Sequence, residues 1–84
     1  MAQIACRGIR GATTADNNDR ESIIDASKEL LESIVNENDL NVDDIAAAFF
    51  TTTKDLTAEY PAVAARRSLG WTQVALSNTH EMEV

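Results

Sequence analysis

The segment over residues 19–37 constrains the fold most, because its apolar residues recur at helical spacing. At about 100° per residue they fill one stripe roughly 180° wide, and polar or charged residues lie opposite. Asn18 or Asp19 can cap the first turn, and Glu21 stands three residues after Asn18. The pattern predicts an amphipathic helix with one buried face. The stripe consists of Ile23, Ile24, Ala26, Leu30, Leu31, Ile34 and Val35.

A chain of 84 residues is long enough for one domain, which we expect over residues 1–84. A core of this size is marginal alone and usually needs a disulfide, a metal or oligomerisation. Cys6 is the single cysteine, so no disulfide can form within the chain. Cys6 and His80 are the only soft metal ligands, which argues against structural zinc. We therefore expect oligomerisation to provide the support.

The first half of the chain contains two further expected elements beside the helix. Residues 3–9 are short and mostly apolar and predict a strand, whereas the small polar residues 10–18 predict a loop. Residues 38–44 predict a polar connection, in which the spacing of Asn41 and Asp44 indicates a short helical turn.

The second half of the chain continues the alternation of predicted strands and helices. Periodicity allows either a helix or a strand over 45–53, and the sequence Phe-Phe-Thr-Thr-Thr favours the strand. Residues 57–69 predict a helix with Pro61 in its first turn and Gly70 as its stop. Residues 71–79 predict a last strand. The expected fold class is α+β with the order β-α-β-α-β.

Charge and hydropathy exclude several functions. Fourteen acidic and seven basic residues give a net charge of −7 without a basic cluster, so nucleic-acid binding is not expected. Apolar runs are too short to span a membrane, and the first residues lack the apolar stretch of a signal peptide. Together with the lone cysteine, these features predict a cytoplasmic protein that binds neither membrane nor nucleic acid.

Few residues indicate chemistry by themselves. His80 is expected to be solvated rather than a general base, and Cys6 is expected in the core. Trp71 and Phe50 are expected to serve packing. Arg10 stands at a strand-to-loop junction, where side chains can point into clefts. Arg10, the helix-terminal Arg66 and the strand-terminal Glu81 could equally be ordinary surface charges; composition and spacing do not decide.

Whole segments carry more information. Arg7-Gly-Ile-Arg-Gly-Ala-Thr-Thr14 resembles the opening signature of the AroH class of monofunctional chorismate mutases. Thr53-Lys-Asp-Leu-Thr-Ala-Glu-Tyr-Pro-Ala62 resembles a second segment of that family, and Ala65-Arg66 and Gly70-Trp71 follow in register. Glu81-Met82-Glu83-Val84 resembles its Glu-Met-Asp-Val. The resemblance covers nearly the whole chain without a gap.

The resemblance implies an isomerase that rearranges chorismate to prephenate on the route to phenylalanine and tyrosine. The family uses neither metal nor cofactor, which suits a pericyclic Claisen rearrangement, because no nucleophile or general base is required. Such an enzyme selects the compact substrate conformer and stabilises the charge that grows on the ether oxygen. The family fold is a homotrimer with a barrel-like sheet core, outer helices and active sites shared between subunits.

The same resemblance assigns site residues. Arg10 matches the arginine that holds a substrate carboxylate, and Glu81 matches the acid that hydrogen-bonds the ring hydroxyl; both are expected to be catalytic. Tyr60 and Ala62 match positions contributed by a neighbouring subunit, and Arg66 matches the arginine near the pocket mouth. The strand segment expected along the ligand consists of Ser77, Asn78, Thr79, His80 and Glu81.

Three departures from the family pattern shape the expectations. Asn78 replaces a cysteine that is frequent in the family, and Val63 replaces a lysine near the pocket. The family's chain also continues into a strand that carries the arginine aimed at the ether oxygen, and later supplies a pocket tyrosine. The domain over 1–84 is therefore expected to be incomplete at its C-terminal end.

The alternative function is a non-catalytic binding or assembly subunit. A generic acidic interaction domain would leave the motifs unexplained.

Overall fold

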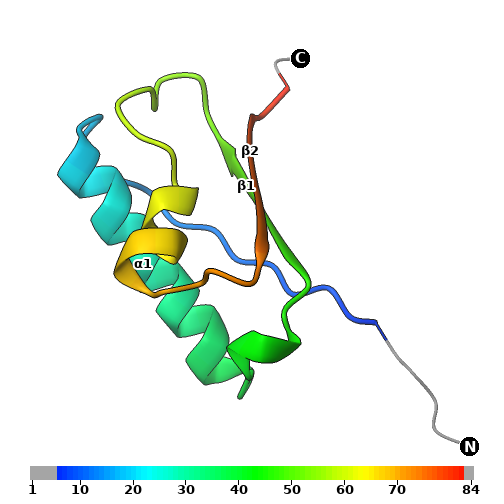
Figure 1. The fold of residues 1–84 in the computed structure, drawn as a ribbon. Helices are drawn as coiled ribbons and strands as arrows, with labels where there is room; N and C mark the ends of the chain where they lie inside the picture. Colours follow the sequence, from blue (N-terminus) through cyan, green and yellow to red (C-terminus); the bar gives the residue numbers. More distant parts are fainter. Residues whose placement is uncertain (1–5, 83–84) are drawn as a thin grey trace, which may run out of the picture.

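The computed structural model describes residues 6–82. The elements follow the order α1 (Arg20–Glu37), η1 (Val42–Asp44), β1 (Ala47–Thr52), η2 (Ala64–Ser68) and β2 (Ala75–His80). Figure 1 shows α1 and η2 packed together on one side of the two strands. The described chain is thus a small α+β fold.

Helix α1 confirms the amphipathic prediction. Asp19 is its N-cap, and the Asp19 Oδ1 atom accepts a hydrogen bond from the Ser22 backbone N–H at 2.7 Å. This bond satisfies one of the amide groups that a helix start leaves without an internal partner. Ile23 and Leu31, both from the predicted stripe, are buried.

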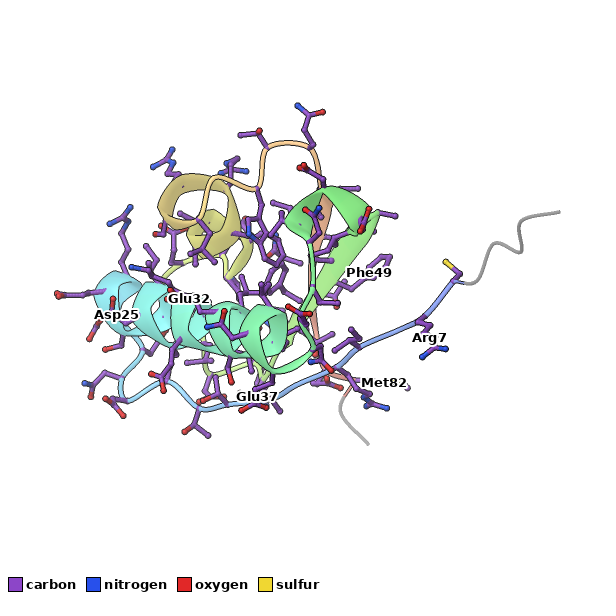
Figure 2. The ribbon with its side chains drawn as sticks, turned by 90° about the horizontal axis from the view of Figure 1, so that it is seen from below. Arg7, Asp25, Glu32, Glu37, Phe49 and Met82 are labelled. Atoms are coloured by element: carbon purple, nitrogen blue, oxygen red, sulfur yellow. The ribbon has the colours of Figure 1, made fainter. Side chains whose placement is uncertain are left out.

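Strands β1 and β2 pair in parallel, with Ala47 opposite Ala75 and Thr52 opposite His80. The predicted strand over 45–53 is therefore confirmed for its central part. Alternate residues of β1 are half-buried and exposed, as expected of a sheet covered on one face only. On the uncovered face the Phe49 side chain is 80% exposed and points away from the helices (Figure 2).

The core lies between α1, η2 and the covered face of the sheet. Its centre consists of Leu31, Ala65, Trp71 and Val74, and Phe50 packs against this group. Burial of a large apolar side chain contributes about 1.5–3 kcal/mol. The predicted packing role of Trp71 and Phe50 is confirmed.

The predicted helix over 57–69 is correct only in its second part. Residues 57–60 form a loop, and η2 has the wide turn of a π-helix, in which the Leu69 N–H donates to the Ala64 carbonyl. Pro61 comes at the start of the turn that leads into this helix. Gly70 ends it with a φ of +70°, a conformation that glycine adopts without strain.

The first predicted strand is wrong over its described part. Residues 6–10 are exposed and extended without strand pairing, while residues 3–5 lie outside the described residues. A strand needs a neighbour for its backbone groups, and in the described structure β1 and β2 pair only with each other. Cys6 is exposed, so its predicted core position is also wrong.

The segment before α1 still contacts the body of the protein at Gly11. A Cβ atom built on Gly11 would lie 3.0 Å from Leu30 Cδ1 and 3.1 Å from Ile34 Cδ1. The absence of a side chain therefore allows the backbone to pass close to α1. The predicted loop over 10–18 is confirmed.

The last strand begins later than predicted. Residues 71–74 precede β2, and the Trp71 N–H donates to the Ala65 carbonyl at 2.9 Å. Trp71 and Val74 thus serve the core rather than the sheet. Among the described residues no helix is long and apolar enough to cross a membrane.

Candidate functional site

A hollow of about 340 Å³ with both polar and apolar walls lies where the two parallel strands end. We call it the strand-end hollow. The carboxyl ends of parallel strands meet at one edge of a sheet, where α/β proteins commonly bind ligands. The hollow is lined by Thr52, Leu56, Thr57, Ala58, Glu59, Tyr60, Pro61, Asn78, Thr79 and His80.

Hydroxyl groups from β1 orient the polar groups that end β2. Thr51 Oγ1 donates to Glu81 Oε1 at 2.6 Å, and Thr52 Oγ1 lies 2.9 Å from His80 Nδ1. The Glu81 N–H also donates to the Thr52 carbonyl at 2.7 Å. Glu81 is therefore held at both its backbone and its carboxylate, one residue beyond His80, which lines the hollow.

Asn78 connects the hollow to the turn that leads into η2. Asn78 Oδ1 accepts a hydrogen bond from the backbone N–H of Ala62 at 3.1 Å. Since a backbone N–H can only donate, the amide oxygen must face Ala62 and the amide nitrogen must lie on the other side. Within residues 6–82, that nitrogen has no protein partner and remains a hydrogen-bond donor at the hollow.

The loop over 53–61 forms the outer wall of the hollow and is tied to the start of α1. Asn18 binds Thr57 and Ala58, and Arg20 Nε lies 3.0 Å from Glu59 Oε2. The Tyr60 N–H donates to Glu59 Oε1 at 2.9 Å. This bond is the main cause that holds the pKa of Glu59 below its ordinary value, and the neighbouring Arg20 acts in the same direction.

The structure brings one part of the predicted site together. Asn78, Thr79 and His80 line the strand-end hollow, while Glu81 follows directly on β2. Tyr60, expected from a neighbouring subunit, lines the same hollow within one chain. Tyr60 is 66% exposed, so its ring is available to a ligand or to another chain. The predicted Ala62 is buried and takes part through its backbone N–H, and Ser77 is a half-buried residue within β2.

The two predicted arginines lie apart from this hollow. Arg10 is exposed on the segment before α1, and Arg66 is exposed on η2; neither lines the hollow. Figure 2 shows the neighbouring Arg7 on the same segment, away from the body of the protein. In one chain the hollow is therefore lined by one carboxylate, that of Glu59, and by no arginine or lysine.

Three residues near the hollow have roles that the sequence does not predict. Asn18 is one of two candidate helix caps in the sequence, yet Asp19 caps the helix and Asn18 binds the distant loop. The sequence predicts only a strand for Thr51 and Thr52, although their hydroxyls contact Glu81 and His80. No local signal identifies these roles, because each contact joins residues about 28 to 40 positions apart. Among the described residues no three His, Cys, Asp or Glu side chains gather as metal ligands.

The fold and the hollow define a small α+β protein with a candidate site at the carboxyl ends of two parallel strands. The sequence matches the family described as "Chorismate mutase type I" over residues 6–84. It is 41% identical over 78 residues to "Chorismate mutase AroH" of Bacillus subtilis (strain 168) and 40% identical over 79 residues to "Chorismate mutase AroH" of Thermus thermophilus. The fold matches that of a chorismate mutase from Clostridium thermocellum with a TM-score of 0.82 and 42% identity.

The chain belongs to the chorismate mutase type I family, the AroH class that its motifs indicated. Each of the two sequence matches covers 93% of this chain, but only 61% of the Bacillus protein and 64% of the Thermus protein. The structural match covers 86% of this chain and 63% of the Clostridium chain. The chain thus corresponds to less than two thirds of each of these relatives.

Proposed function

We propose that residues 1–84 form a single chorismate mutase domain, C-terminally incomplete relative to the family, that binds chorismate and takes part in its rearrangement to prephenate. The observation that carries the proposal is the grouping of Tyr60, Asn78, Thr79 and His80 around one hollow in a chain of this family. Glu81 does not line the hollow but directly follows His80, which does. A cytoplasmic location stays a prediction from the sequence.

The proposed chemistry requires positioning and electrostatics rather than a nucleophile. Glu81, oriented by Thr51, accepts a hydrogen bond from the ring hydroxyl of chorismate. The free amide nitrogen of Asn78 supplies a donor at the same edge. Arg10 pairs with a substrate carboxylate, for which the planar guanidinium is suited. These contacts favour the compact conformer in which the reacting carbons approach each other. No cofactor or metal is needed.

Glu81→Ala provides the first test of this proposal. In protein that converts chorismate, we expect this substitution to lower kcat/KM about 10- to 100-fold. A hydrogen bond to a charged group contributes about 1.5–3 kcal/mol. The measurement is the loss of chorismate absorbance with prephenate identified as the product. Glu37→Ala at the end of α1 is the control and should keep the original rate. Equal rates for the two variants would contradict the role of Glu81.

The absence of arginines from the hollow supports a shared site. Chorismate carries two carboxylates, and an acidic chain of net charge −7 attracts such a dianion only where cations are placed locally. In one chain Arg10 and Arg66 do not line the hollow, so we propose that two different copies in a homotrimer supply them, one copy Arg10 and the other Arg66. The uncovered face of the sheet around Phe49 offers the apolar surface for a barrel-like core between copies.

Subunit mixing tests the shared site. Arg10→Ala and Arg66→Ala subunits, each slow alone, should regain activity when unfolded and refolded together. Random mixing would restore both arginines in about one site in four. A mixture of Arg10→Ala subunits with the Arg10→Ala/Arg66→Ala double variant has no intact site and is the control. Sedimentation that shows a stable, active monomer would refute the proposal.

The alternative is a binding or assembly subunit without catalysis. The match to the family over residues 6–84 favours this alternative over a generic interaction domain. Calorimetry with chorismate separates the two functions: a binding subunit would bind chorismate without producing prephenate.

A further inference from the structure

One side chain ties the loop over 53–61 to the start of α1. Asn18 Oδ1 accepts hydrogen bonds from the Thr57 N–H at 2.9 Å and the Ala58 N–H at 3.0 Å. Asn18 Nδ2 donates to Thr57 Oγ1 at 3.0 Å. Three bonds from a single carboxamide therefore hold two successive residues of the loop.

A second tie lies two residues along the chain. Arg20 forms an ion pair with Glu59, and the other oxygen of that carboxylate accepts the Tyr60 N–H. Asn18 and Arg20 together fix the segment from Thr57 to Tyr60. We call these contacts of Asn18 and Arg20 the loop clasp. In Figure 1 the start of α1 and this loop lie side by side.

The clasped segment has little else to hold it. It contains neither helix nor strand, and its neighbours supply one bond at each end, from the Leu56 N–H to the Thr53 carbonyl and from the Val63 N–H to the Tyr60 carbonyl. The same segment lines the strand-end hollow from Thr57 to Tyr60. The shape of the hollow on this side therefore depends on residues that do not line it.

We propose that Asn18 is a positioning residue that sets the place of Tyr60 at the hollow through the loop clasp. The proposal rests on the proposed function only for its kinetic consequence, since the clasp itself can be measured without substrate. Asn18 does not line the hollow and acts through its hydrogen bonds to Thr57 and Ala58. Its loss should weaken substrate binding more than it slows the bound substrate.

The substitution can be made without breaking α1. Asp19, not Asn18, caps the helix, so Asn18→Ala leaves that bond in place. Asn18→Asp is the conservative variant, because a carboxylate can accept both backbone N–H groups and the Thr57 hydroxyl as well. Asn17→Ala is the matched control: within residues 6–82, Asn17 is exposed and takes part in no hydrogen bond.

The experiment combines amide hydrogen exchange with kinetics on the active protein. In Asn18→Ala we expect exchange at Ala58 to accelerate about tenfold or more while amides in the middle of α1 stay unchanged. KM for chorismate should rise about threefold to tenfold, the range that loss of an ordinary hydrogen bond produces, with a smaller change in kcat. Asn18→Asp should restore both values, and Asn17→Ala should match the original protein.

Each outcome decides a separate point. Unchanged exchange in Asn18→Ala, or faster exchange with unchanged KM, would overturn the positioning role. A fall in kcat at constant KM that Asn18→Asp does not rescue would also overturn it. If the unsubstituted protein fails to convert chorismate, the proposed function is contradicted, and the exchange data alone then decide whether Asn18 holds the loop.

Discussion

Arg10→Ala is expected to remove about 2–5 kcal/mol of transition-state binding from the active protein, because a buried substrate carboxylate would lose its charged partner. At about 1.4 kcal/mol for each factor of ten, kcat/KM should fall by roughly 30- to 3,000-fold. The measurement is the steady-state rate of chorismate loss over a range of substrate concentrations.

Two further variants sharpen this test. Arg10→Lys should recover only part of the loss, because lysine keeps the charge but lacks the two-pronged donor of the guanidinium. Lys28→Ala is the control, since Lys28 is an exposed cation on α1, outside the expected site. Near-normal kinetics for Arg10→Ala would identify Arg10 as an ordinary surface charge.

The second large effect concerns residues 1–84 on their own. We expect this chain to convert chorismate at least about a hundredfold more slowly than the Bacillus relative, of which it spans 61%. The resemblance places the arginine aimed at the ether oxygen in the part of the family that follows. Removing one such preorganised donor typically costs about 10²–10³ in rate. Arg10 and Glu81 should leave a residual rate, because conformer selection also contributes.

Stability should change in the same direction. In the described structure the sheet has two strands and an uncovered face with Phe49 80% exposed, so its edges and this face remain open to other chains. The test compares residues 1–84 with the same chain extended past Val84 by the downstream sequence, using chorismate absorbance and thermal unfolding. Equal rates would mean that the later arginine is dispensable or replaced by Arg7 or Arg67.

Local chemistry accounts for the elements that were predicted correctly. The stripe from Ile23 to Val35 and the cap at Asp19 are properties of neighbouring residues, and α1 forms where they predict it. The β-branched run after Phe50 and the glycine at position 70 act in the same way. The family motifs were also readable, because several short segments kept their order and spacing.

Elements that depend on a partner were predicted less well. Residues 6–9 have the composition of a strand, but without a paired neighbour in the described structure they remain extended and exposed. Residues 57–60 form no helix: Pro61 disfavours helical backbone at Tyr60, and Asn18 holds the amides of Thr57 and Ala58 in the loop. In both cases a distant group, or its absence, outweighed local preference.

In the candidate site, too, some features follow from local sequence and others from long-range contacts. Sequence alone determined the family, the helix with its buried face, and the residue types available for carboxylate and hydroxyl recognition, because these follow from local pattern and composition. Only the tertiary structure decided that Thr51 orients Glu81, that Asn78 faces Ala62, that Asn18 holds the loop of Tyr60, and that Arg10 and Arg66 do not line the hollow of one chain. The physical reason is that each of these contacts joins groups far apart in the chain, and only the packing of α1 and η2 against the paired strands sets the distances between them.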